Sequence, residues 1–134
     1  MIKRNSKVFS AIFSTKLNDF IARSSPLCDN LAMNYKIETS TEFDNWLSRL
    51  KDRKVKARLA SRFARIENGN FGDWSVTTEE GVFELRFFFG SGFRVYYALR
   101  GETIVLLLNG GDKSTQSKDI AKAKQILDAL QEQI

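Results

Sequence analysis

Three isolated cations lie among apolar residues between Glu84 and Ser114, and they are the residues of this chain best suited to chemistry. Arg86 and Arg94 are part of strand-like runs, and Lys113 follows a Gly-Gly-Asp sequence. Arginine is almost always protonated, and its planar, paired donors match the oxygens of a phosphate. Three such cations at the ends of a small sheet predict a phosphate site that needs neither a metal ion nor a histidine.

Alternation along the strands decides which of these side chains share a surface. Successive residues of a strand point to opposite faces, so Arg94 and Tyr96 are expected on the same face. Antiparallel pairing of Val82–Phe89 with Phe93–Leu99 adds Arg86 to that surface. We therefore predict one cluster made of Arg86, Arg94 and Tyr96, with the lysine of the following loop close by.

Cleavage of RNA is the reaction that such a cluster can support. RNA carries its own nucleophile, the 2′-hydroxyl, and preorganised cations stabilise the negative charge that builds up in the transition state. Tyr96, or a lysine whose pKa is lowered by neighbouring cations, can transfer a proton. We predict catalytic roles for Arg86, Arg94, Lys113 and Tyr96. The structural alternative is that Arg86 pairs with Glu84 or Glu102 and that Arg94 binds a carbonyl at the turn.

Four further cations recur on a predicted helix. Lys54, Arg58, Arg62 and Arg65 are spaced i, i+4, i+8 and i+11, which at about 3.6 residues per turn places them in a narrow arc beside the apolar stripe. An exposed row of cations suits a phosphate backbone, because each neutralised phosphate releases counterions. We predict that these four residues bind nucleic acid. The alternative is a solvated helix face that only keeps the protein soluble.

The composition narrows the possible chemistry. The 134 residues include no histidine and a single cysteine, and the formal net charge is +5. The lack of histidine excludes Ser-His and Cys-His catalytic pairs and His-based zinc sites, and the carboxylates are too scattered for Mg²⁺. We therefore expect no metal and no cofactor. The positive net charge favours a polyanionic partner. The single thiol, Cys28, is typical of a protein of the reducing cytoplasm. No apolar run reaches the ~18 residues that a membrane helix needs.

The elements that must position these residues begin with two helices. A short strand, Tyr35–Glu38, precedes Thr39-Ser-Thr-Glu42, which has the spacing of a capping box. The helix that follows has apolar residues at i, i+3, i+4 and i+7. A polar break leads to a second helix, which ends at Asn68-Gly69-Asn70. Two helices joined this tightly predict a helical hairpin; their apolar stripes are Phe43, Trp46, Leu47, Leu50 and Val55, Leu59, Phe63, Ile66.

The second half of the chain has β character and then ends in a helix. After a short strand at Asp73–Thr77, the runs Val82–Phe89, Phe93–Leu99 and Thr103–Asn109 predict a three-stranded meander. Gly110-Gly111 predicts a sharp turn that aims Lys113. A stripe at 3-4 spacing from Thr115 onward predicts a C-terminal helix. The predicted fold is α+β, with a small antiparallel sheet packed on an N-terminal helical hairpin and a C-terminal helix.

Residues 1–32 differ in character from the rest of the chain. They contain the only proline, Pro26, and a basic, Ser-rich sequence whose apolar patch is too short for a secretory signal. We predict a single domain over residues 33–134 and, over residues 1–32, an extension that is disordered or not native. Met33 is then a plausible alternative start.

The order β-α-α-β-β-β-α, together with particular blocks of sequence, resembles the RelE/ParE toxin superfamily and its HigB-like branch of addiction-module killer proteins. The resemblance runs from Met33 to near the C-terminus. Its most specific blocks, taken as a pair, are Gly90-Ser-Gly-Phe-Arg-Val-Tyr96 and Gly110-Gly-Asp-Lys-Ser-Thr-Gln116, and Gly81-Val-Phe-Glu-Leu-Arg86 is a further match.

This resemblance implies the toxin of a type II toxin–antitoxin system, neutralised by a cognate antitoxin. RelE-like members cut mRNA in the ribosomal A site, so it implies a metal-independent endoribonuclease in which Arg86, Arg94 and Lys113 contact the scissile phosphate. The chain departs from the family pattern in two ways: Lys118-Asp119-Ile120 stands in the region where some RelE-like members carry a catalytic tyrosine, and the chain has no histidine, which HigB-like members often use. Two alternatives therefore stay open, a ParE-like inhibitor of DNA gyrase that cuts nothing and an inactive orphan toxin that only binds antitoxin.

Overall fold

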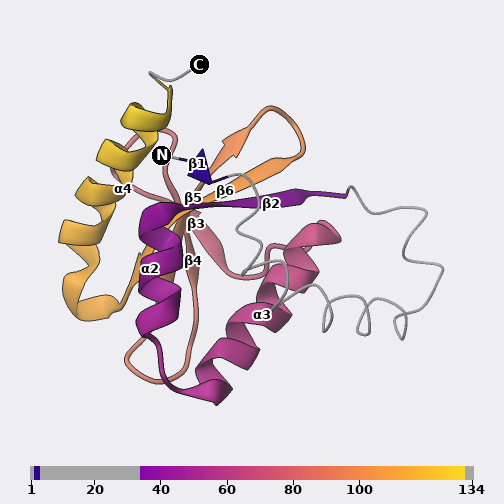
Figure 1. Cartoon of the computed structure of the whole chain (residues 1–134), viewed down its shortest axis with the longest axis vertical. Helices are drawn as coiled ribbons and strands as arrows, with labels where there is room; N and C mark the ends of the chain where they lie inside the picture. The colour runs from indigo at the N-terminus through magenta and orange to yellow at the C-terminus, as the bar shows by residue number, and fades with distance from the viewer. Residues whose placement is uncertain (1, 4–33, 132–134) are drawn as a thin grey trace.

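Six strands form one mixed sheet in the computed structural model, which describes residues 2–3 and 34–131 (Figure 1). The order across the sheet is β1-β2-β6-β5-β4-β3. The strands are β1 (Ile2–Lys3), β2 (Lys36–Ser40), β3 (Trp74–Val76), β4 (Phe83–Arg86), β5 (Arg94–Arg100) and β6 (Ile104–Gly111). Neighbouring strands are antiparallel except β2 and β6, which run parallel.

Three helices and a short 3-10 turn complete the described part of the chain. They are α2 (Thr41–Arg49), α3 (Arg53–Glu67), the turn η2 (Lys113–Thr115) and α4 (Gln116–Gln131). The predicted α+β fold, with its helical hairpin and C-terminal helix, is confirmed. The parallel pair adds to that prediction, which contained antiparallel strands only. It arises because the chain passes through α2, α3 and three strands before β6 returns beside β2, and parallel neighbours need such a crossover.

The start of α2 differs by one residue from the predicted capping box. Thr39 belongs to β2, and Ser40 is the N-cap. The Ser40 Oγ accepts a hydrogen bond from the Phe43 backbone N–H at 3.0 Å and donates to the Leu108 carbonyl at 2.5 Å. Ser40 is also the last residue of β2, so one hydroxyl caps the helix and ties its start to β6.

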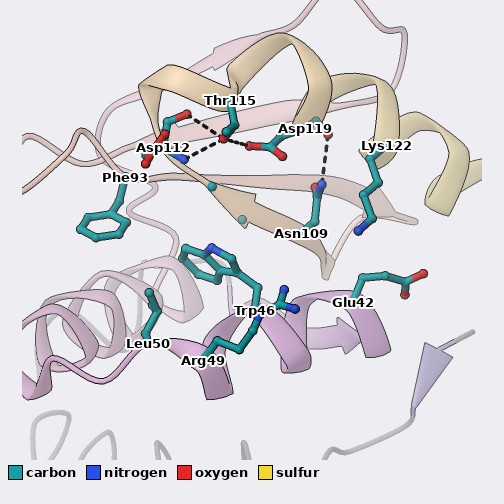
Figure 2. A pocket seen from close by; sticks show the side chains of 12 residues that line it. Glu42, Trp46, Arg49, Leu50, Phe93, Asn109, Asp112, Thr115, Asp119 and Lys122 are labelled. Carbon is teal, nitrogen blue, oxygen red and sulfur yellow. Dashed lines mark hydrogen bonds between the residues drawn. The ribbon is translucent and has the colours of Figure 1, made fainter.

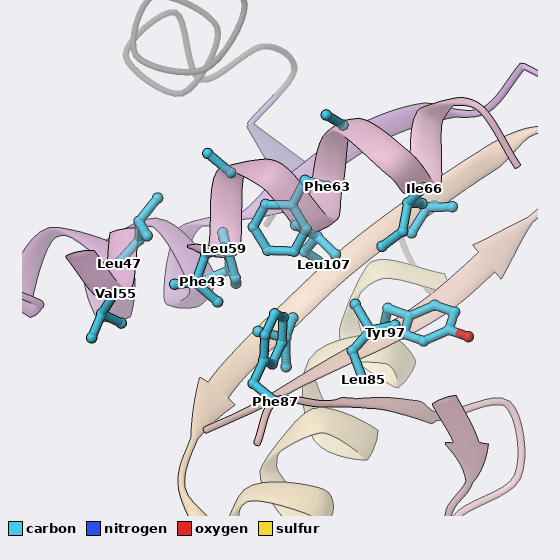
Figure 3. Packing of buried hydrophobic residues seen from close by; sticks show 14 residues of the cluster. Phe43, Leu47, Val55, Leu59, Phe63, Ile66, Leu85, Phe87, Tyr97 and Leu107 are labelled. Carbon is cyan, nitrogen blue, oxygen red and sulfur yellow. The ribbon is translucent and has the colours of Figure 1, made fainter. Parts of the chain in front are cut away.

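The sheet has an apolar core on each face. On one face, α2 and α3 pack Phe43, Leu59 and Phe63 against residues of β4, β5 and β6 (Figure 3). On the other face, α4 packs Ala123, Leu127 and Leu130 against a separate set of residues, which are Val82 just before β4 and the strand residues Tyr96, Ala98, Leu106 and Leu108. Alternation along β5 and β6 divides these residues between the two cores.

The N-terminal region is described only at Ile2–Lys3, which pair with Thr39 and Ser40 of β2. The remainder of the predicted extension lies outside the described residues, so its disorder and its origin stay predictions. None of the helices in the described part of the chain is long and apolar enough to cross a membrane.

We predict that Ser40→Ala lowers the free energy of unfolding by about 1–3 kcal/mol, because the helix loses its cap and the Leu108 carbonyl loses its donor. Urea denaturation measures the change. Ser48→Ala is the matched control: the exposed Ser48 hydroxyl only donates to the Asn45 carbonyl of its own helix, and we expect an effect within about 0.5 kcal/mol. Equal stability of the two variants would contradict the proposed role of Ser40.

Candidate functional site

A cavity of about 220 Å³ lies where α3 meets the end of β4. We call it the arginine cavity, because four arginines and one aspartate line it. Three of the four helix cations and one of the three predicted cations between Glu84 and Ser114, which appear in the sequence as separate features, therefore meet in one place. The lining residues are Arg58, Ser61, Arg62, Arg65, Asp73, Arg86, Phe87, Phe88 and Phe89.

Arg62 is the structural centre of the cavity wall. Its side chain donates to three backbone carbonyls: Nε to Phe71 at 2.7 Å, Nη2 to Asp73 at 2.6 Å and Nη1 to Arg86 at 3.0 Å. Its guanidinium also lies 4.8 Å from the ring centroid of Phe87. Burial, with the nearby charge of Arg65, lowers the pKa of Arg62. We call these contacts the Arg62 clamp, since they hold α3, the loop at residues 71–73 and the end of β4 together.

The burial of Arg62 corrects the prediction that all four helix cations lie on an exposed face. Arg62 is only 7% exposed, whereas Lys54, Arg58 and Arg65 are exposed. The reason is its helical phase: Val55, Leu59, Arg62 and Ile66 follow a 4-3-4 spacing, so Arg62 lies within the apolar stripe itself. That spacing is a sequence signal that could have identified Arg62 as a buried residue.

Gly72 allows the loop to pass over Arg62. Its φ is +69°, and a Cβ at this position would lie 2.7 Å from the Arg62 Nε. A side chain there is therefore excluded both by the backbone conformation and by the guanidinium beneath it.

Arg86 is held by Asp73, a partner that the sequence pattern does not predict. Its Nε and Nη2 donate to the two carboxylate oxygens of Asp73, at 3.1 and 2.8 Å. This hydrogen bonding raises the pKa of Arg86. Glu84, one of the predicted partners, instead accepts from Ser75 and Gln116. Asp73 fixes the guanidinium plane, and the Arg86 Nη1 has no hydrogen bond to the described residues, so it is free to donate to a ligand.

Arg94 lies directly opposite Arg86 in the β4–β5 register. Directly paired residues share a face of the sheet, as the alternation predicts. Its Nε is buried without a hydrogen-bond partner. Lys113 is exposed on η2, near the turn that joins β4 to β5: a Cβ placed on Gly92 would lie 3.4 Å from the Lys113 Cβ. Arg94, Lys113 and Lys54 are not among the residues that line the arginine cavity.

Tyr96 lies on the same face as Arg94 but beneath α4. Its side chain is fully buried, and its hydroxyl has no hydrogen-bond partner. Burial, reinforced by the carboxylates of Glu84 and Asp119, raises the pKa of Tyr96 above its usual range. Strand alternation gives the face on which a residue lies but not the element that covers it, so the burial of this hydroxyl could not be read from the pattern.

A second cavity, of about 380 Å³, lies between α2 and the start of α4 (Figure 2). Its charges are mixed: Glu42 and Arg49 of α2 lie on one side, and Asp112, Asp119 and Lys122 lie on the other. Three carboxylates against two cations make this cavity a poor site for a phosphate, because like charges repel. The arginine cavity, with four cations and one carboxylate, is the better candidate.

The side chains around the second cavity explain why residues 110 and 111 are glycines. These residues are the end of β6 and not the predicted sharp turn. A Cβ on Gly110 would lie 2.5 Å from the ring of Trp46, and one on Gly111 would collide with the carboxylate of Asp119. The glycines are needed because α2 and α4 approach the strand closely, and the turn itself begins at Asp112, whose side chain accepts from the Ser114 N–H at 2.9 Å.

Comparison with known proteins gives two matches. The family described as "Phage derived protein Gp49-like (DUF891)" matches residues 45–131. A protein of Haemophilus influenzae (strain KW20 / Rd), described only as uncharacterized, is 46% identical over 98 residues, which cover 73% of this chain and 98% of that protein. No solved structure matches. The family match includes every residue that lines the arginine cavity.

We predict that Arg62→Lys lowers the free energy of unfolding by about 3 kcal/mol, because a lysine cannot replace all three donors and leaves buried carbonyls unpaired. Arg65→Lys, one turn further along the same helix and exposed, is the control and should change stability by less than about 0.5 kcal/mol. Chemical denaturation of both variants tests this. If the two substitutions cost the same, the clamp does not stabilise the fold.

Proposed function

This chain belongs to the phage-derived Gp49-like family of the RelE/ParE-like toxin superfamily. We propose that it is a ribosome-dependent mRNA endonuclease that inhibits translation. Membership makes it the toxin type of a toxin–antitoxin system, with an antitoxin as partner. The endonuclease activity, the ribosome and the mRNA are our proposal, as is its place in the HigB-like branch, which rests on the sequence blocks around Arg94 and Lys113.

The observation that carries this proposal is the arginine cavity. Arg58 and Arg65 are exposed at its rim, and Arg86 is oriented by Asp73 with one nitrogen free to donate. Cations fixed before the substrate arrives stabilise developing negative charge without the cost of reorganisation. A phosphodiester in this cavity meets such donors from both the helix and the strand, which is the arrangement that phosphoryl chemistry requires.

The reaction we propose uses the RNA's own nucleophile. The 2′-oxygen forms a bond to phosphorus, the bond from phosphorus to the 5′-oxygen breaks, and the proton lost by the 2′-hydroxyl is balanced by one gained at the leaving oxygen. The products are a 2′,3′-cyclic phosphate and a 5′-hydroxyl. Arg86, with Arg58 and Arg65, stabilises the charge on the phosphate. Water carries the proton, since the Tyr96 hydroxyl is buried and the chain has no histidine.

Arg94 and Lys113 lie outside the cavity lining, and we assign them a second role. Arg94 is opposite Arg86 on the sheet, and the exposed Lys113 is close to the β4–β5 turn. Both cations are therefore near the same end of the sheet, where they attract the neighbouring phosphates of the message. Their contribution is to binding, with charge stabilisation left to the cavity.

A second candidate function is favoured by one observation, the burial of Tyr96. The described residues that line the arginine cavity include no histidine, lysine or tyrosine to transfer a proton. A ParE-like inhibitor of DNA gyrase needs no proton transfer and can use the same cations for binding alone. The two candidates differ in outcome: the nuclease leaves new 5′ ends on mRNA, whereas the inhibitor blocks supercoiling and cuts nothing.

We predict that Arg58→Ala and Arg86→Ala each reduce mRNA cleavage by about 10²-fold, because each removes a preorganised cation from the transition state. Primer extension on a message translated in vitro measures the new 5′ ends. Lys118→Ala, an exposed cation on α4 outside the cavity, is the control and should cleave normally. Thermal melts confirm that the variants fold. Translation that stops without new 5′ ends would falsify the nuclease, and a supercoiling assay on the same protein then tests the gyrase candidate.

We predict that Tyr96→Phe leaves cleavage nearly unchanged, because the hydroxyl is buried and makes no hydrogen bond. Removal of a true general acid or base would cost about 10²-fold or more. The same assay measures the rate, and urea denaturation should show equal or greater stability, since an unpaired buried hydroxyl is lost. A large fall in cleavage at unchanged stability would contradict this prediction and show that the Tyr96 hydroxyl takes part in catalysis.

A further inference from the structure

Phe88 is the most exposed large apolar side chain in the described part of the chain. It is 82% exposed, and it lies at the rim of the arginine cavity. An isolated exposed apolar residue is ordinary, so exposure alone carries no argument. The location is what matters, because an aromatic ring beside cations that bind phosphate is the combination that single-stranded RNA requires.

The residues on either side hold Phe88 in this outward position. Phe87 is 4% exposed, and its backbone N–H donates to the Phe93 carbonyl at 3.0 Å. The guanidinium of Arg62 stacks over its ring. Phe89 is partly buried against Phe87 and Phe93, and the guanidinium of Arg58 lies 4.8 Å from its ring centroid. Both neighbouring rings are packed, so the chain between them presents Phe88 to solvent beside the same arginines.

We propose that Phe88 is a stacking platform for an unpaired base next to the phosphate bound in the arginine cavity. This rests on the proposed function, since it assumes that the cavity binds RNA. Other aromatic rings in this part of the chain are engaged to a greater extent. The Phe93 ring packs on Trp46 and Phe89. Trp74, which follows the cavity residue Asp73, is 48% exposed but packs edge-on against Phe83, so Phe88 has the most open ring face.

The surroundings favour RNA over a protein as the occupant of this ring. Phenylalanine and arginine are both common at protein interfaces, but four arginines and only one aspartate line the cavity beside Phe88, and this excess of positive charge favours an anionic ligand. A nucleotide satisfies both parts of the surface, since its base is apolar on its faces and its phosphate is anionic. Stacking accepts any base, so the contribution of Phe88 is to affinity for single strands and not to sequence.

A binding cycle with two matched RNA probes tests this inference. Each probe is a short single-stranded RNA, one intact and one with an abasic nucleotide at its centre, and fluorescence anisotropy at low ionic strength measures affinity, because phosphate contacts are strongest there. We expect Phe88→Leu, which keeps an apolar side chain but removes the ring, to bind the intact probe about tenfold more weakly. Phe88→Trp should restore the affinity, and Val76→Ala, at an exposed apolar residue of β3 outside the cavity, should leave it unchanged.

The abasic probe separates stacking from a general loss of binding. Wild type and Phe88→Leu should bind it equally, because the base that distinguishes them is gone. Equal affinity of the two proteins for the intact probe overturns the inference while leaving the cationic site intact, provided Arg58→Ala still weakens binding. If the wild type binds neither probe, the RNA site itself fails, and Phe88 with it. A Phe88→Leu defect confined to antitoxin binding would identify a protein contact and also overturn the proposal.

Discussion

The buried guanidinium of Arg62 is the interaction on which the candidate site depends. A charge taken out of water is costly unless hydrogen bonds compensate it, and here three carbonyls and an aromatic face do so. Those three carbonyls belong to Phe71, Asp73 and Arg86, so one side chain fixes both ends of the Asp73–Arg86 ion pair. Asp73 holds the Arg86 guanidinium in the cavity wall, and Arg62 joins that wall to α3.

Three arginines of α3 thus have different roles, because they lie at different positions around the helix. Arg62 faces inward and is structural, Arg58 lies over the ring of Phe89, and Arg65 is exposed at the rim and lowers the pKa of Arg62 by its charge. The buried guanidinium of Arg62 is repelled by the positive charges of Arg58 and Arg65. The aspartate at position 73 offsets part of that repulsion, and it is the one carboxylate in the cavity lining.

Local patterns in the sequence predicted much of this fold, and the contacts they missed are distant in sequence. Apolar spacing identified α2, α3 and α4, and alternation placed Arg86 and Arg94 on one face, because both signals depend on neighbouring residues. The pairing of Arg86 with Asp73 joins a strand to a loop, and the parallel β2–β6 pair joins the two ends of the domain. Neither of these contacts produces a periodic pattern in the sequence. The 4-3-4 spacing places Arg62 within the apolar stripe, and this spacing is visible in the sequence. An arginine is nevertheless expected to be exposed until the buried carbonyls that bind it are known.

The parallel pairing of β2 with β6 has a consequence for the order of events during synthesis. The Ser40 hydroxyl that begins α2 binds the Leu108 carbonyl, 68 residues later, and β2 has only the short β1 on its other side. The strand β2 therefore cannot pair with β6 until almost the whole chain has left the ribosome, and such distant contacts are slow to form. A nascent chain that stops before β6 lacks the central strand against which both cores pack, so it carries the arginines of α3 without the folded wall that orients them.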